Sequence, residues 1–140
     1  MSDVTTSDPN TMTGSCNCGS VRITIPRSDQ MVLCHCTSCR KSGGSMASSN
    51  FSIPTEDLIV EGSEPKQYKT KGTSGGEVTR NFCGECGSPL WTAVADPSSV
   101  FVKGGLFDPH TVPQPNAHLF AKNMEDWEIV HEGAERLETQ

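Results

Sequence analysis

The sequence lacks three features that each indicate a particular class of protein. No run approaches the roughly 18 apolar residues that a membrane-spanning helix needs, so we expect no membrane segment. The first ten residues, MSDVTTSDPN, have neither a basic start nor an apolar stretch, and they therefore do not resemble a signal peptide. Positive charge is scarce, because 11 lysines and arginines face 17 acidic residues and the formal net charge is −6. Proteins bind nucleic acids largely by neutralising phosphates, so this charge argues against a nucleic-acid partner.

The length of the chain, 140 residues, suits one domain. Residues 1–12 are polar and include Pro9, so we expect a disordered tail there, followed by a single domain over 13–134 and a second tail over 135–140. Apolar residues make up only 34% of the chain, and bound metal ions would help to hold so lean a core.

Short segments rich in apolar residues, separated by glycine and proline, predict strands along most of the domain. We expect strands over 21–25, 31–33, 58–60, 67–69, 78–82, 90–94, 100–102, 118–120 and 127–130, with Trp127 packed in the core. Helix is expected only as single turns at 37–42 and 54–57. This pattern predicts a mainly β fold with little helix.

The cysteines are the strongest signal in the chain. There are seven, in three tight groups: Cys16 and Cys18; Cys34, Cys36 and Cys39; Cys83 and Cys86. An odd number of cysteines does not suit a disulfide framework. Cysteines separated by only one or two residues are poorly placed for long-loop disulfides and well placed to chelate a metal ion. We therefore expect zinc binding in a reduced, cytoplasmic protein.

The spacing predicts two zinc ions, because seven ligands divide into four and three. The turn over Cys83–Cys86, with Gly84 and Gly87, is typical of a zinc knuckle, and Cys16 and Cys18 lie on one face of an extended segment. These four complete a closed structural site, whereas Cys34, Cys36 and Cys39 leave one zinc position for water, substrate or His35. A second structural site closed by an outside ligand is the alternative, and a metal-free redox sensor is a weaker one.

An open zinc site with three thiolates favours one kind of chemistry. The complex carries a net negative charge, so it is a weak Lewis acid but well suited to hold a fourth thiolate. A thiol substrate bound there would be deprotonated near neutral pH and would attack a nearby carbonyl carbon. The site therefore favours making or breaking a carbon–sulfur bond over hydrolysis.

Three segments resemble the glutathione-dependent formaldehyde-activating enzyme family, also called the CENP-V/GFA domain family. They are Gly14–Val21, Cys34–Lys41 and Arg80–Leu90, and the later Pro115–Phe120 and Trp127 also fit the family pattern. All seven cysteines match in order and spacing. The resemblance implies an Mss4-like fold of several small antiparallel sheets stapled by zinc, with two zinc ions per chain. It also implies a structural ion at Cys16, Cys18, Cys83 and Cys86, and a catalytic ion at Cys34, Cys36 and Cys39.

The founding activity of this family is the condensation of formaldehyde with glutathione. The resemblance therefore implies a zinc-dependent carbon–sulfur lyase that acts on glutathione, or a similar thiol, and a small electrophile such as formaldehyde. The alternative is a non-catalytic zinc-binding module with a recognition or chaperone-like role. Exposed β edges also make a homodimer a reasonable expectation.

A few residues outside the cysteine groups are candidates for the site. His118 is the candidate proton donor, although a buried structural histidine is the plainer interpretation. Arg40 and Lys41 are candidates to bind a glutathione carboxylate. The backbone N–H groups of Gly43 and Gly44 are candidates to bind a carboxylate or carbonyl oxygen, and Phe101–Gly105 is a candidate wall.

Overall fold

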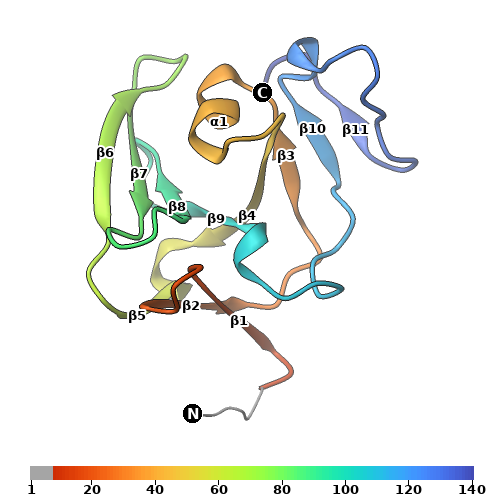
Figure 1. Ribbon diagram of the computed structural model, residues 1–140. Helices are drawn as coiled ribbons and strands as arrows, with labels where there is room; N and C mark the ends of the chain where they lie inside the picture. The colour runs from red at the N-terminus through yellow and green to blue at the C-terminus, as the bar shows by residue number, and fades with distance from the viewer. Residues whose placement is uncertain (1–7) are drawn as a thin grey trace.

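The structure is a computed structural model, which describes residues 8–140 as two β-sheets with little helix (Figure 1). The smaller sheet has the strand order β1-β2-β5, formed by Thr11–Ser15, Val21–Pro26 and Ile59–Gly62. The larger sheet has the order β11-β10-β3-β4-β9-β8-β7-β6. Its strands in that order are Glu135–Arg136, Ala117–Leu119, Val32–Cys34, Ser48–Pro54, Ser99–Lys103, Pro89–Ala93, Glu77–Phe82 and Lys66–Lys71. The prediction of a mainly β fold is confirmed.

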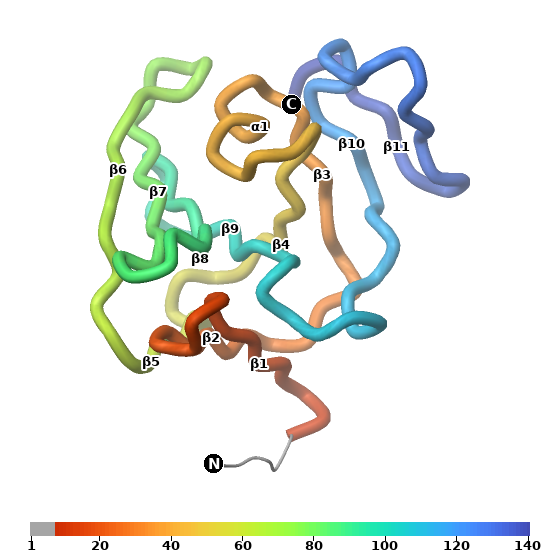
Figure 2. The backbone as a smooth tube through the Cα atoms, in the orientation of Figure 1, coloured from red at the N-terminus to blue at the C-terminus, as the bar shows by residue number. Residues whose placement is uncertain are grey.

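The eight-stranded sheet curls, and the helix α1 (Thr37–Gly43) lies between its two ends (Figure 1). In this sheet, the neighbouring strands along β3-β4-β9-β8-β7-β6 pair antiparallel. The strand β10 pairs parallel with both β3 and β11. The larger sheet is therefore partly parallel, whereas the smaller sheet is antiparallel throughout. The tube in Figure 2 shows the C-terminus near α1 and the N-terminal strand at the far side of the fold.

Both predicted helical turns are present. The helix α1 starts after Cys36, whose sulfur accepts a hydrogen bond from the Cys39 N–H, and it ends at Gly44, which has φ 67°. The second turn is the 3-10 helix η2 (Thr55–Asp57), and two further 3-10 turns are η3 (Gly104–Leu106) and η4 (Ala121–Asn123). The helices within residues 8–140 are too short and too polar to cross a membrane.

The main core lies between the three-stranded sheet and the centre of the larger sheet. In β2, Val21, Ile23 and Ile25 alternate with polar residues and are completely buried. They belong to one cluster with side chains of β4, β8 and β9, among them Phe51 and Leu90. Each such side chain stabilises the fold by roughly 1.5–3 kcal/mol relative to exposure. Cys16 and Cys83 belong to the same cluster, so one cysteine from each of the pairs Cys16/Cys18 and Cys83/Cys86 is part of the core.

The largest departure from the predicted elements is the central strand β4, which the sequence pattern did not indicate. Its buried positions include the polar residues Ser48 and Asn50, so the alternation of apolar and polar residues is hidden. The segment 127–130 forms no strand, and Trp127 is 71% exposed rather than packed in the core.

Within residues 8–140, strands extend into both segments that the sequence analysis expects to be tails. Residues 1–7 lie outside the described part, but β1 begins at Thr11, and Met12 is buried in the core. At the other end, residues 135–136 form β11, and the Phe120 N–H donates to the Thr139 carbonyl at 2.7 Å. Backbone pairing fixes both segments because the neighbouring strand offers free hydrogen-bonding groups.

Candidate metal centres and the cavity between them

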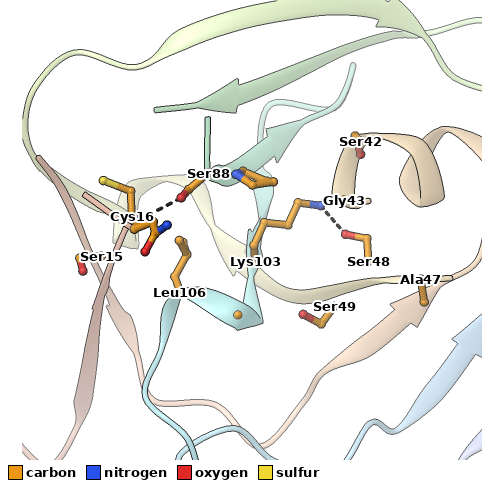
Figure 3. Close-up of a pocket in the computed structure, with 13 residues that line it drawn as sticks. Ser15, Cys16, Ser42, Gly43, Ala47, Ser48, Ser49, Ser88, Lys103 and Leu106 are labelled. Carbon is orange, nitrogen blue, oxygen red and sulfur yellow. Dashed lines mark hydrogen bonds between the residues drawn. The ribbon is translucent and has the colours of Figure 1, made fainter. Parts of the chain in front are cut away.

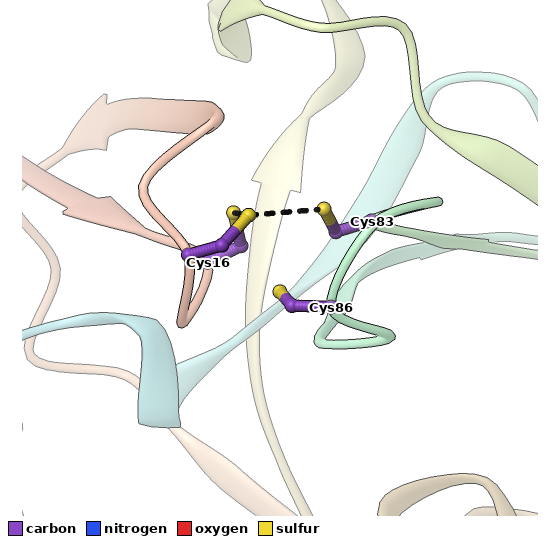
Figure 4. Close-up of side chains that lie close together, drawn as sticks. Cys16, Cys83 and Cys86 are labelled. Atoms are coloured by element: carbon purple, nitrogen blue, oxygen red, sulfur yellow. Dashed lines mark hydrogen bonds between the residues drawn. The ribbon is translucent and has the colours of Figure 1, made fainter.

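The first candidate metal centre joins two turns that are far apart in the sequence (Figure 4). The sulfurs of Cys16, Cys18, Cys83 and Cys86 all lie within 4.8 Å of one another. The two turns are alike. The Gly19 N–H donates to the Cys16 carbonyl at 3.0 Å, and the Gly87 N–H donates to the Cys83 carbonyl at 2.9 Å. Gly19 and Gly87 have φ values of 82° and 80°, a left-handed conformation that glycine adopts without steric cost.

The spacing of these sulfurs fits zinc. With Zn–S bonds of about 2.3 Å, the sulfurs of a tetrahedral site lie about 3.8 Å apart. The Sγ atoms of Cys16 and Cys18 are 3.7 Å apart, and those of Cys18 and Cys83 are 3.8 Å apart. All seven cysteines are free thiols in the structure. Four thiols in this arrangement form a complete tetrahedral set, which is typical of a structural site.

Hydrogen-bond donors surround the four sulfurs. The Val21 N–H donates to Cys16 Sγ at 3.3 Å, and the Glu85 N–H donates to Cys83 Sγ at 3.4 Å. The Cys18 thiol donates to the Ser20 hydroxyl at 3.1 Å, the Ser20 hydroxyl lies 3.3 Å from Cys83 Sγ, and the Ser88 hydroxyl lies 3.2 Å from Cys86 Sγ. The Ser88 hydroxyl lowers the pKa of the Cys86 thiol to about 5. Such donors stabilise thiolates, the form that binds metal.

The second candidate metal centre lies where β3 runs into α1. Cys34 ends the strand, Cys36 precedes the helix, and Cys39 lies in its first turn. Their sulfurs also lie within 4.8 Å of one another, and the small cluster around them includes the buried Phe120. Hydrogen bonds among the three thiols lower the pKa of Cys36 and raise the pKa of Cys34. Three sulfurs on one short segment can bind one face of a zinc ion.

Within residues 8–140, no other histidine, cysteine or carboxylate joins these three sulfurs. His35, the neighbour in sequence, instead turns towards the buried His118, which in turn contacts the exposed His131. Its Nε2 lies 3.0 Å from Nδ1 of His118, whose Nε2 lies 3.3 Å from Nδ1 of His131. Glu128 lies 3.7 Å from Nδ1 of His35. Among the described residues, this group therefore consists of three protein sulfurs and no fourth ligand atom.

A cavity of about 640 Å³ extends from Cys16 of the first group to Ser42 and Gly43 at the end of α1. Its lining consists of Ser15, Cys16, Asn17, Ser42, Gly43, Ala47, Ser48, Ser49, Ser88, Pro89, Lys103, Gly105 and Leu106. Figure 3 shows Lys103 reaching from β9 towards Ser48 and the end of α1. A smaller cavity of about 180 Å³ shares Ser42, Pro89 and Lys103 with the first. The two cavities thus meet beside the helix that carries Cys39.

Lys103 is the main feature of the site that the sequence reasoning missed. Its Nζ donates to Ser48 Oγ at 2.8 Å and to Asn50 Oδ1 at 2.7 Å. Burial lowers the pKa of Lys103 to about 8, while the thiols of the three-cysteine group act to raise it. The wall predicted over Phe101–Gly105 was the signal closest to this residue.

Arg80 is a second cation beside the three-cysteine group. Its Nη2 donates to Ser38 Oγ at 2.8 Å, one residue before Cys39, and its charge acts to lower the pKa of Cys36. Arg80 also lines the smaller cavity. A fixed guanidinium here offsets the negative charge that three thiolates would leave on a bound zinc ion.

The other predicted residues divide between the cavity and its surroundings. Gly43 lines the larger cavity, whereas Gly44 forms the C-cap of α1. Arg40 is engaged in an ion pair with Glu125 at 3.0 Å, and Lys41 is exposed. His118 lines neither of the two cavities and is only 1% exposed.

Comparisons with known proteins agree with this geometry. A model of the family described as glutathione-dependent formaldehyde-activating enzyme matches residues 11–123. A crystal structure of a Rhodobacter sphaeroides protein, a structural-genomics target, is similar with a TM-score of 0.56 and 24% identity. The match covers 73% of this chain and 98% of that one, and it shows a shared fold. A search of curated proteins finds no match.

Proposed function

The chain belongs to the glutathione-dependent formaldehyde-activating enzyme family, and from this premise we propose a zinc-dependent carbon–sulfur lyase. The reaction is the reversible addition of glutathione, or a similar thiol, to a small electrophile such as formaldehyde. The observation that carries the proposal is the three-cysteine group with no fourth protein ligand among the described residues. A purely structural site would be closed by a fourth side chain.

The division of roles follows from the positions of the residues. Cys16, Cys18, Cys83 and Cys86 would hold a structural zinc ion, and Cys34, Cys36 and Cys39 would hold the reactive one. When bound there, zinc would lower the pKa of a coordinated thiol and keep its sulfur nucleophilic. The hydroxyls and backbone groups of the larger cavity, Gly43 among them, would bind the polar body of the thiol substrate. Free cysteines throughout suit a reducing compartment such as the cytoplasm.

The test is a measurement of carbon–sulfur bond exchange on the zinc-loaded protein. Exchange NMR with ¹³C-labelled formaldehyde and glutathione follows formation and cleavage of the adduct at equilibrium. We expect an exchange rate that exceeds the uncatalysed rate in proportion to protein concentration. The same measurement with glyoxylate and methylglyoxal, and with 2-mercaptoethanol, tests other electrophiles and thiols. Rates equal to the uncatalysed reaction for every pair would favour a zinc-binding recognition module instead.

For His118 we propose a positioning role exerted through His35. His118 lies opposite Leu33 in the β10–β3 pairing, so its side chain projects from the sheet face opposite to that of Cys34. Its contact with His35 fixes the segment between the ligands Cys34 and Cys36. We expect His118→Ala to weaken zinc binding at the three-cysteine site by about 10- to 100-fold.

The measurement for His118 is competition for zinc with a chromophoric chelator, which reports affinity without turnover. His118→Gln retains a hydrogen-bonding side chain and should restore most of the affinity. Unchanged zinc affinity in a folded His118→Ala protein would contradict the positioning role.

A further inference from the structure

Lys103 is a half-buried cation for which the described residues supply no carboxylate partner. None of the four ion pairs within residues 8–140 includes it. An ammonium group has three N–H donors, and Ser48 and Asn50 accept two of them. Burying a charge is costly unless it is paired and hydrogen-bonded, so a lysine at this position requires an explanation.

The sheet places Lys103 on the same face as a ligand of the three-cysteine site. Cys34 lies directly opposite Ser48 in the β3–β4 pairing, and Asn50 lies opposite Lys103 in the β4–β9 pairing. Directly opposed residues share a face, and Ser48 and Asn50 share one because side chains alternate along a strand. Ser48 and Asn50 therefore hold the ammonium group on the Cys34 side of the sheet.

The surroundings of Lys103 make its third donor available to a ligand. It is the only lysine, arginine, aspartate or glutamate that lines the larger cavity, and it also lines the smaller one. The other polar groups of the larger cavity are serine hydroxyls, an asparagine amide and backbone groups. Within this lining, Lys103 is thus the strongest candidate for stabilising an oxygen that becomes negative during reaction.

We propose that Lys103 is a catalytic residue that binds the carbonyl oxygen of the electrophile and protonates it as the carbon–sulfur bond forms. The assignment rests on the carbon–sulfur lyase function proposed above. The cavity that Lys103 lines then receives the body of the thiol and the small aldehyde next to α1, the helix that carries Cys39.

The step balances without a further reactant. The thiolate sulfur attacks the carbonyl carbon, the S–C bond forms, and the π electron pair of the carbonyl moves to its oxygen. That oxygen takes the third proton of Lys103 Nζ and becomes the hydroxyl of the adduct, and the neutral amine regains a proton from solvent. In the reverse direction the amine removes the hydroxyl proton, the C=O bond re-forms and the S–C bond breaks.

The first test compares exchange rates of zinc-loaded variants. Lys103→Met removes the donor at similar volume and should slow exchange by about 100- to 1000-fold. Lys103→Arg keeps a cationic donor and should retain more of the rate than Lys103→Met. Lys69→Met, on the exposed strand β6, is the matched control and should react like the wild type. Zinc content and thermal unfolding verify that each variant is folded.

The second test is the pH dependence of the condensation rate. Burial lowers the pKa of Lys103 to about 8, Arg80 also acts to lower it, and the thiols of Cys39, Cys34 and Cys36 act to raise it. The ammonium is needed for condensation, so the wild-type rate should fall as the pH rises through about 8. In Lys103→Arg the guanidinium stays protonated, and this fall should disappear. A purely structural lysine would leave the pH profile of Lys103→Arg unchanged.

The third test needs no turnover. Formaldehyde with cyanoborohydride methylates accessible neutral amines, and mass spectrometry locates the modified lysines. Because its pKa is lowered to about 8, Lys103 should be modified at neutral pH before the exposed lysines. Lack of modification at Lys103 while the other lysines react would overturn the proposal, because a small aldehyde then does not reach the amine.

These outcomes separate the two proposals. A wild type with no exchange activity but a modified Lys103 contradicts the lyase function, and with it the catalytic role that depends on it. An active wild type whose Lys103→Met variant is equally active, with the same pH profile, overturns the role of Lys103 alone.

Discussion

Cys83→Ser is expected to leave the chain unfolded at 25 °C, even with excess zinc present. Cys83 is 1% exposed and belongs both to the main core and to the four-cysteine group. Apparent binding free energies of structural zinc are about 10–16 kcal/mol, whereas a domain is stable by only about 5–15 kcal/mol. Loss of this ion therefore removes a stabilising free energy comparable to the whole free energy of folding.

Circular dichroism and thermal unfolding of the variant test this expectation. Chelation of the wild-type protein should give the same loss of structure, because it removes the same ion. Arg22→Gln is a matched control in the same half of the molecule, since its ion pair with Glu61 is exposed. Cooperative unfolding of Cys83→Ser near the wild-type temperature would contradict a structural metal site.

Cys36→Ser is expected to abolish catalysis while leaving the protein folded. The three-cysteine group belongs to a small cluster with Phe120, apart from the main core. Cys36 is also the N-cap of α1, and serine is a favourable N-cap, so the helix should persist. With one of three ligands lost, zinc binding at this site should fail and exchange should drop to the uncatalysed rate.

Three readouts on one sample test Cys36→Ser. Zinc per chain should fall from two to one, thermal unfolding should remain cooperative, and ¹³C exchange should equal the uncatalysed rate. An exchange rate like that of the wild type, in a variant with one zinc ion, would show that the reaction does not take place at this site.

The sequence predicted the two cysteine groups because their chemistry is local. Cys34, Cys36 and Cys39 lie within six residues, and the pairs Cys16/Cys18 and Cys83/Cys86 are each turns with glycine at the required position. The division into four and three needed only the preferred coordination number of zinc. The partnership of residues 16–18 with 83–86 was then the one arrangement that completed a closed site.

The cavity that Lys103 lines was not predictable in the same way. It depends on β4, where buried Ser48 and Asn50 interrupt the apolar pattern that marks a strand. Both polar side chains accept hydrogen bonds from Lys103 across the sheet, a contact that no pattern in the sequence marks. The features that hid β4 from the sequence pattern are therefore those that form the site. Trp127, in contrast, was expected in the core as part of a strand over 127–130, and that segment forms no strand.

The central claim is that the seven cysteines hold two zinc ions, divided four and three. Native mass spectrometry of the zinc-loaded wild-type protein measures the number of ions per chain most directly. We expect the chain to carry two zinc ions. A chain that carries one ion, with three thiols free to react with iodoacetamide, would contradict the reactive zinc site and the function built on it.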